Sequence, residues 1–424
     1  MEIIEISKEE LKSFLVTYQG LHPNKPKADR SEIIQFIKRV GCIQYDPLNM
    51  VGHNPDLMLQ SRFYNYDPSI LNRLLYETRD VIDGWDKMMA IYLTEDWPYF
   101  RRMRVKKREE IEGILTYRNS SSALQYVEEV KEHIVNKGPI SPAFIDFGRA
   151  EKGRWGHGKL SSATMDYMWN VGILSVKEKK NTQKIYDLTE NLLPSHVLEQ
   201  KDPFVDDYSF YKWYFKRRIG SLGAYWLRNG GGWLGHFVSD KKLRIHVLNE
   251  LFEDGELVQL KIKGSKEIFY MRSEDKEVLN QMSMEIPVSK ALFLAPLDNL
   301  LWDRKLIKDI FDFEYSWEVY KPVSSRKYGY YVLPVLVGNQ LVARFEPEKH
   351  RANEPLNVKN WWWEDGITIT GQLIDAVFEG INDFCSYLKA DGLSPKSTER
   401  ITTSRLKGID GKNTDNNVNY VAKG

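Results

Sequence analysis

Apolar residues recur at helical spacing twice in the middle of the chain, and each pattern ends at a glycine. The first ends at Gly172; the second contains Leu243, Val247 and Leu251 and ends at Gly255. A spacing of three or four residues places such side chains on one face of a helix, and glycine readily adopts the left-handed conformation that closes a helix. Each glycine therefore predicts the C-terminus of an amphipathic helix.

Each of these helices is followed by two alternating segments around a short polar turn, Asn181-Thr182 in the first unit and Gly264-Ser265 in the second. A shorter helical segment precedes each unit, at residues 130–135 and 211–219. Two helices followed by a hairpin are typical of a winged helix-turn-helix, so two such domains are predicted here.

A third copy is predicted nearer the N-terminus. Residues 33–40 carry an apolar stripe at helical spacing, Asp29 and Glu32 resemble a capping box, and Gly41 would close the helix. Further on, Asp83-Gly84 is a hairpin-turn signal.

From about Phe293 onward the pattern changes to short strands. Three strand-like runs are followed by a helix near residues 373–388, and Gly338-Asn339 marks a tight turn between the last two runs. The runs are Trp317–Pro322, Tyr328–Val337 and Gln340–Phe345. They predict a small antiparallel sheet or barrel.

The expected fold is therefore α+β, with three tandem winged helix-turn-helix domains on a C-terminal β-barrel. We expect the first domain at 1–120, the second at 121–200 and the third at 201–285. The barrel with its terminal helix is expected at 286–390. Residues 391–424 are polar with few apolar positions, which predicts a disordered tail.

Composition narrows the class of protein. With 424 residues, 42% hydrophobic and 28% charged, the chain has the make-up of a soluble protein of about three domains. It has no apolar run of the ~20 residues that a membrane helix needs, and a charged N-terminus argues against a usual secretory signal. Its two cysteines, Cys42 and Cys385, are too far apart to indicate a disulfide framework or a thiolate metal site. We expect a cytoplasmic protein without a metal or cofactor.

Charge is nearly balanced, with 60 basic and 59 acidic residues. The sum argues against a dedicated nucleic-acid binder, but the basic residues are clustered. Lysines decorate both predicted hairpins, and they include Lys179 and Lys180 in the first and Lys261 and Lys263 in the second. A solvated surface explains any one cluster, whereas clusters on matching hairpins favour DNA contacts.

Candidate chemistry lies in the stretch Gly41–Asn49, which reads GCIQYDPLN. Pro47 biases Asp46 toward extended geometry, and in an extended segment Gln44 and Asp46 share a face. A carboxylate and an amide held side by side can serve catalysis. Asp before Pro also commonly starts a turn with its side chain bound to backbone N–H groups, and the spacing alone leaves both interpretations open.

The same stretch, with His53 and Ser61-Arg62 behind it, resembles the active-site region of the YcaQ-like and AlkZ-like winged-helix DNA glycosylases. In that family a Gln-x-Gln or Gln-x-Asp pair is the catalytic motif. Further family-like segments extend the resemblance over residues 30–390. They are Glu95–Pro98, Trp155–Lys159, Leu301–Arg304, Tyr320–Pro322 and Arg326–Pro334. One departure is that the family's Trp-x-His pattern reads Trp85-Asp-Lys here.

The resemblance implies a monofunctional DNA glycosylase that hydrolyses the N-glycosidic bond of alkylated purines of the N7-alkylguanine type, with interstrand crosslinks as candidate substrates. Such a base already carries a positive charge, so one carboxylate is enough. Asp46 would stabilise the sugar cation and accept the proton of a water that Gln44 positions. A lyase step is not expected, because no lysine neighbours the pair in sequence. The family also implies little or no base flipping.

The expected partner is double-stranded DNA with alkylated or crosslinked purines, bound by a monomer without membrane association. The candidate DNA-binding residues are His53, Arg62, Trp85, His157, Lys159, Lys179, Lys180, Lys261, Lys263, Arg326 and Lys327. Among them, His53 could instead orient water or be a surface residue. Arg62 could instead brace Asp46 or form a core salt bridge.

A second class of function fits the same fold, since winged helices also build transcription regulators without chemistry. Regulators usually dimerise to read two half-sites, and no dimer interface is evident in the sequence. They would also leave Gln44 and Asp46 without a role.

Overall fold

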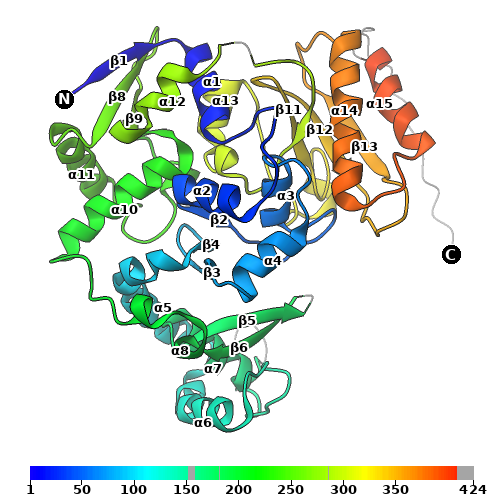
Figure 1. Ribbon diagram of the computed structural model, residues 1–424. Coiled ribbons are helices and arrows are strands. Elements are labelled where there is room, and N and C mark those ends of the chain that lie inside the picture. Colours follow the sequence, from blue (N-terminus) through cyan, green and yellow to red (C-terminus); the bar gives the residue numbers. More distant parts are fainter. Residues whose placement is uncertain (151–157, 181, 285, 408–424) are drawn as a thin grey trace.

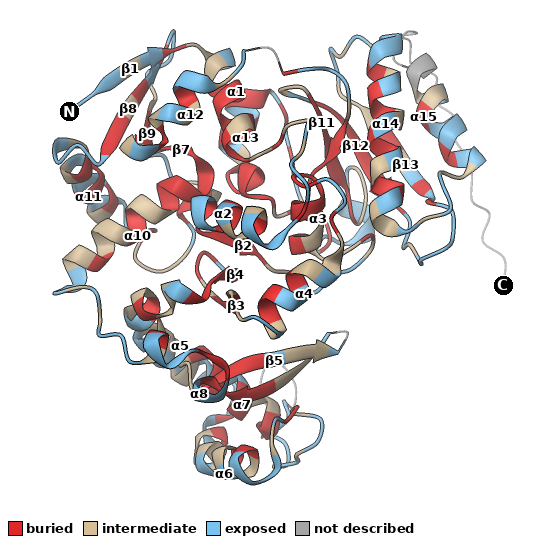
Figure 2. Ribbon diagram, viewed as in Figure 1, coloured by how far each residue is buried: buried red, intermediate tan, exposed pale blue. Residues whose placement is uncertain are grey.

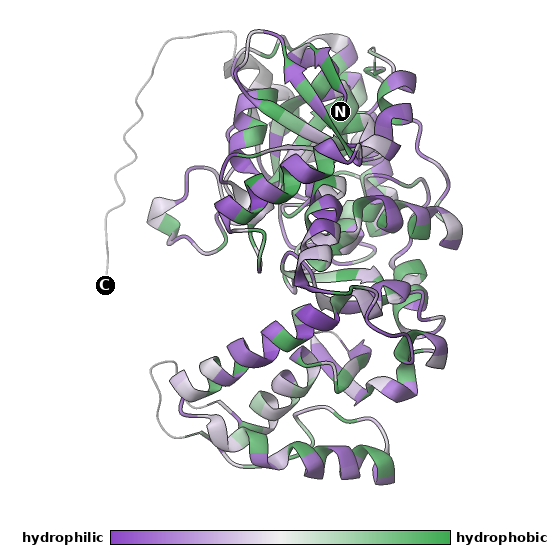
Figure 3. Ribbon diagram, turned by 90° about the vertical axis from the view of Figure 1, so that its left-hand side faces the viewer, coloured by the Kyte–Doolittle hydropathy of each residue, from purple (hydrophilic) through white to green (hydrophobic). Residues whose placement is uncertain are grey.

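The computed structural model describes residues 1–150, 158–180, 182–284 and 286–407. Two hydrophobic cores organise this part of the chain. The larger core runs through most of the molecule, and the smaller one lies within residues 115–188. This second lobe projects below the rest in Figure 1, and Figure 2 shows buried residues gathered inside both parts. Along the helices of the second lobe, hydrophilic and hydrophobic residues alternate, as expected of amphipathic elements (Figure 3).

The first segment forms a three-stranded sheet with helices around it. The strands pair in the order β2-β4-β3, all antiparallel. The elements are α2 (Arg30–Val40), β2 (Cys42–Gln44), α3 (Asn54–Gln60), α4 (Pro68–Tyr76), β3 (Val81–Trp85) and β4 (Met89–Leu93). The predicted helix is confirmed: Asp29 caps it by accepting a hydrogen bond from Glu32 N, and Gly41 at φ +76° ends it.

The hairpin signal at Asp83-Gly84 lies inside β3, and the turn of the β3–β4 hairpin comes later, at Asp86–Met88. Gly84 serves packing instead, because a Cβ there would lie 2.5 Å from Cε1 of Tyr92 on the neighbouring strand. The hairpin itself is therefore confirmed, with the turn displaced.

The second lobe contains the next two predicted helices and their hairpin. Its elements are α5 (Arg101–Tyr117), α6 (Val127–Lys137), α7 (Leu160–Asn170), β5 (Leu174–Lys180) and β6 (Gln183–Leu188). Strands β5 and β6 pair antiparallel, as predicted. Two short helices, α8 (Thr189–Leu192) and α9 (Ser195–Leu198), lead out of the lobe.

The third segment also combines helices with a small sheet. Its elements are α10 (Asp207–Leu222), β7 (Ala224–Trp226), α11 (Lys241–Glu253), β8 (Leu257–Ile262), β9 (Ile268–Arg272) and α12 (Lys276–Gln281). The N-terminal strand β1 (Ile3–Ile6) joins this sheet, parallel to β8, and α1 (Lys8–Tyr18) follows it. The first residues therefore pack with the third segment, and not with the first as expected. The number of winged helices stays a prediction.

The predicted C-terminal barrel is wrong. Strands β10, β11, β12 and β13 form an open four-stranded sheet in that order, and the two end strands do not pair among the residues described. Helices cover the sheet instead (Figure 1). The elements are β10 (Leu292–Phe293), α13 (Arg304–Phe311), β11 (Leu333–Val337), β12 (Gln340–Pro347), β13 (Val358–Trp363) and α14 (Gly371–Leu388).

Two further expectations in this region need correction. Trp317–Pro322 is a loop and not a strand, because buried Glu318 accepts hydrogen bonds from the backbone N–H groups of Lys327 and Tyr328 at 3.2 and 2.9 Å. The tail predicted to be disordered contains helix α15 (Pro395–Lys407), which packs on β13 and buries Ile401. Residues 408–424 lie outside the described part.

Candidate active site

The Gln-x-Asp pair lies where β2 leaves its sheet. Gln44 is the last residue of β2, opposite Ala90 of β4, and its backbone oxygen accepts a hydrogen bond of 2.8 Å from Asn54 Nδ2. The same Asn54 side chain accepts a hydrogen bond from Leu297 N at 3.0 Å. The position of the motif is therefore fixed between the first segment and the C-terminal segment.

Asp46 has one occupied and one available carboxylate oxygen. Its Oδ1 accepts a hydrogen bond of 2.9 Å from Leu48 N, so the turn expected of an Asp-Pro sequence does form. The side chain is half-buried, and no cationic side chain in the described residues forms an ion pair with it. Burial raises the pKa of Asp46, and the Leu48 N–H opposes that rise.

Gln44 is almost fully buried, with 8% of its surface exposed. Its Oε1 lies 3.3 Å from Nζ of Lys87, a residue in the turn of the β3–β4 hairpin. The expectation that no lysine neighbours the pair holds in sequence but not in space. The departure of Trp85-Asp-Lys from the family pattern was the signal that could have pointed to Lys87.

A loop of the C-terminal segment lies within electrostatic range of Asp46. Partial desolvation of its hydroxyl, and after it the charge of Asp46, raises the pKa of Tyr320 on this loop. Tyr320 is 81% exposed, and its ring packs edge-on against Trp317. The bonds of Glu318 described above hold the loop in place, so an exposed aromatic ring is fixed near the candidate carboxylate.

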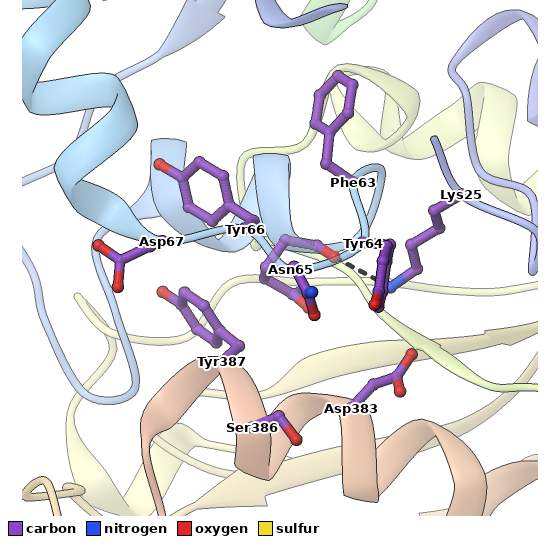
Figure 4. Close-up of a pocket in the computed structure, with 10 residues that line it drawn as sticks. Lys25, Phe63, Tyr64, Asn65, Tyr66, Asp67, Asp383, Ser386 and Tyr387 are labelled. Carbon is purple, nitrogen blue, oxygen red and sulfur yellow. Dashed lines mark hydrogen bonds between the residues drawn. The ribbon is translucent and has the colours of Figure 1, made fainter. Parts of the chain in front are cut away.

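Two cavities flank the segment that follows the motif. One, of about 300 Å³, is lined by Tyr45, Asn49, His53, Asp56 and Lys179, among others. The other, of about 350 Å³, lies farther along the chain between residues 60–67 and α14; Figure 4 shows Lys25, Tyr64 and Tyr387 around it. Tyr387 lines both cavities, but no residue of Gln44–His53 lines the second.

His53 belongs to the motif loop. It precedes α3, its ring stacks on Tyr45 with centroids 6.2 Å apart, and Nε2 lies 3.4 Å from Nδ2 of Asn49. Burial, followed by the charge of Lys179, lowers the pKa of His53, which favours the neutral ring. Contact with DNA stays a prediction for this residue.

Arg62 is not placed to contact DNA. It is 1% exposed and forms a bidentate ion pair with Asp298, with N···O distances of 2.7 and 2.8 Å. The guanidinium also lies over the ring of Phe36. Of the interpretations left open by the sequence, the core salt bridge is the one confirmed.

The side chain of Lys179 also makes its contacts within the protein. Its Nζ lies 2.5 Å from Asp83 Oδ1 and 3.6 Å from the centre of the Tyr45 ring, and only 9% of the side chain is exposed. Trp85 packs against Trp169 and under Lys107 Nζ. Both expected DNA contacts are therefore replaced by contacts between the first segment and the second lobe.

The remaining candidates are more exposed. Lys159, Lys180, Lys261, Lys263 and Lys327 are exposed, and Arg326 is partly exposed with Nε bound to Lys321 O. Hairpins β5–β6 and β8–β9 lie apart from each other in the molecule (Figure 1), so their lysines do not form a single patch. His157 lies outside the described residues.

Nothing in the described residues suggests a metal site, since no three His, Cys, Asp or Glu side chains are grouped as ligands there. No helix in the same residues is long and apolar enough to cross a membrane.

Comparisons with known proteins identify the fold and the family of the chain. The chain resembles in structure the Streptomyces sahachiroi DNA glycosylase AlkZ, with a TM-score of 0.57 and 14% sequence identity. The likeness covers 92% of this chain and 99% of that one, and it shows a shared fold. Residues 37–384, which include the Gln-x-Asp motif and the C-terminal sheet, match the family described as DNA glycosylase AlkZ-like. Because this match spans most of the sequence, the chain belongs to the AlkZ-like family of DNA glycosylases, which hydrolyse N-glycosidic bonds.

Proposed function

We propose that this chain is a monofunctional glycosylase that releases alkylated purines of the N7-alkylguanine type from double-stranded DNA. Asp46 stabilises the positive charge that develops on the deoxyribose and accepts a proton from the attacking water, which Gln44 positions. Interstrand crosslinks through guanine N7 fall under the same proposal, because the bond cleaved is the same.

The observation that carries this proposal is the state of Asp46. The buried carboxylates of Asp86 and Asp298 are held in ion pairs, whereas the half-buried carboxylate of Asp46 accepts one backbone N–H bond and has no cationic partner in the described residues. A partly desolvated carboxylate without a cation is poised to stabilise a positive charge brought to it. The developing sugar cation supplies that charge.

The chemistry needs no second acid. N7 alkylation leaves the purine positively charged, so the base departs as a neutral molecule when the C1′–N9 bond breaks. The protein must stabilise the sugar cation and place a water, and a carboxylate and an amide suffice for these two tasks.

DNA would be held by exposed basic side chains, which leave the catalytic carboxylate free. We assign this role to Lys159, Lys180, Lys261, Lys263, Arg326 and Lys327, with His53 at the motif itself. Arg326 and Lys327 belong to the same loop as Tyr320, whose hydroxyl senses the charge of Asp46. The other lysines would contact phosphates farther along a duplex.

The test is incubation with a duplex that carries a single N7-methylguanine, followed by alkaline cleavage of abasic sites. We expect strand cleavage at the lesion only after alkali, because a monofunctional enzyme leaves the abasic strand intact. Intact strands with both this adduct and a crosslinked guanine would reject the proposed substrates, and DNA binding alone would favour the regulator alternative.

A further inference from the structure

Lys87 is a buried cation at the candidate active site. It lies in the tight turn of the β3–β4 hairpin, where Asp86 N donates to Met88 O at 3.0 Å, and it is 7% exposed. Its Nζ lies 3.3 Å from Oε1 of Gln44 and 4.8 Å from the centre of the Trp302 ring.

The turn that carries Lys87 is anchored to helix α10. Asp86 accepts hydrogen bonds from Arg217 Nε at 2.9 Å and from Arg218 Nη2 at 3.3 Å, and its backbone oxygen accepts one from the hydroxyl of Tyr214. The backbone at Lys87 is therefore held from a neighbouring element, and its ammonium is directed at Gln44.

Folding alone does not account for a lysine at this place. No carboxylate in the described residues lies within ion-pair distance of Nζ, and two other cations, Arg218 and Arg304, repel it. Burial and these cations lower the pKa of Lys87 to about 7. A buried ammonium without a carboxylate partner costs stability. Its one hydrogen-bond acceptor among the described side chains is the amide of Gln44.

We propose that Lys87 is a positioning residue that fixes which end of the Gln44 amide faces the reacting water. In its charged form the Lys87 side chain has only donors, so it holds Oε1 of Gln44 toward itself. The NH₂ end of the amide then points away from Lys87 and is available as a donor. This inference rests on the proposed function, in which Gln44 positions the water.

This orientation of the Gln44 amide determines which groups hydrogen-bond to the attacking water and which lone pair of the water faces C1′. Gln44 donates an N–H to one lone pair, Asp46 accepts a proton, and the second lone pair attacks C1′. As the O–C1′ bond forms, the C1′–N9 bond breaks and its electron pair neutralises the cationic base. The proton released by the water goes to Asp46. If the amide were reversed, its oxygen would accept the second proton of the water, the N–H bond to the water's lone pair would be lost, and the water would be held in a different orientation.

The test is the single-turnover excision rate of Lys87→Met, which keeps the unbranched side chain up to the position of Cε and removes the donor. We expect the rate to fall about 10- to 100-fold, the loss typical of one charged hydrogen bond, with unchanged DNA affinity. Lys87→Gln should recover part of the rate, because its own amide N–H can donate to Oε1. Equal rates for Lys87→Met and the unmodified protein would overturn the proposal.

The matched control is Lys25→Met. Lys25 is a partly buried lysine, whose Nζ donates to Gln60 O at 3.0 Å at the cavity of Figure 4, away from Gln44–His53. Its removal should leave the excision rate unchanged. A loss equal to that of Lys87→Met would show a general cost of removing a lysine from the protein interior and would overturn the positioning role.

A double-mutant cycle separates this inference from the proposed function. In a Gln44→Ala background, Lys87→Met should cause no further loss, because Lys87 acts through Gln44. A full additional loss in that background would overturn the inference while leaving the role of Asp46 intact. Borohydride trapping of a covalent DNA complex that disappears in Lys87→Met would also overturn it, because the amine would then be a nucleophile. If Lys87→Met does not fold, Lys87→Gln in the Gln44→Ala background carries the same test.

Discussion

Nζ of Lys179 lies 2.5 Å from Oδ1 of Asp83, and this ion pair joins the β5–β6 hairpin of the second lobe to the β3 strand of the first segment. The hydroxyl of Tyr76 donates to the other oxygen of the same carboxylate at 3.1 Å. The ammonium also lies 3.6 Å from the centre of the ring of Tyr45, which stands between Gln44 and Asp46. A lysine that we expected on a DNA-binding wing therefore packs against the Gln-x-Asp motif within the protein.

Lys179→Met should therefore act on stability and not on DNA contacts. It leaves Asp83 buried with only the Tyr76 hydroxyl as partner, and breaking such a pair typically costs about 3–5 kcal/mol. Urea unfolding should show the loss, while the salt dependence of DNA binding stays unchanged. A variant of unchanged stability whose DNA binding depends less on salt would show instead that Lys179 contacts DNA.

Exposed lysines should behave in the opposite way. Lys327→Ala should weaken binding to any duplex and lower the slope of log affinity against log salt by about one, the effect of losing one phosphate contact. Its free energy of unfolding should change little. Lys8→Ala, which removes a lysine paired with Asp312 far from the motif, is the control and should leave the slope unchanged.

The excision rate should rise with pH as Asp46 loses its proton. Since burial raises the pKa of Asp46, the midpoint of this rise should lie above the ordinary aspartate range. The single-turnover rate, corrected for spontaneous depurination, gives the midpoint. A rate independent of pH across the acidic range would contradict a role for the carboxylate.

The raised pKa of Asp46 also predicts how the stability of the protein depends on pH. A carboxyl group whose pKa is higher in the folded state than in the unfolded chain contributes stability at low pH, and this contribution is lost as pH rises through the folded value. Asp46→Asn should therefore be at least as stable as the unmodified protein at neutral pH, with its relative advantage smaller in acid. Urea unfolding at several pH values measures the difference.

Local patterns predicted many of the elements and the hairpins, but not how distant elements pair. The helix that ends at Gly41 and both lysine-bearing hairpins followed from periodicity and glycine caps. The parallel pairing of β1 with β8 joins residues about 250 positions apart, which no local signal encodes. Helix α15 is polar along most of its length, and it is stabilised by packing against β13.

At the site, sequence reasoning found the motif but misplaced its surroundings. Arg62 was assigned to DNA by its place in the family-like segment and Lys179 by its place on a predicted hairpin, whereas buried carboxylates hold both of them inside. Lys87 was missed because its relation to Gln44 depends on the pairing of β2 with β4, which brings the hairpin turn beside the end of β2.

The most direct measurement of the central claim is the single-turnover excision of N7-methylguanine from a duplex by Asp46→Asn. The asparagine can keep an acceptor for Leu48 N, while it removes the charge and replaces the other oxygen by an NH₂ group of similar size. We expect excision to fall at least about 1,000-fold, with DNA affinity and melting temperature unchanged or slightly raised. Excision at the rate of the unmodified protein would contradict the assignment of Asp46 as the catalytic carboxylate.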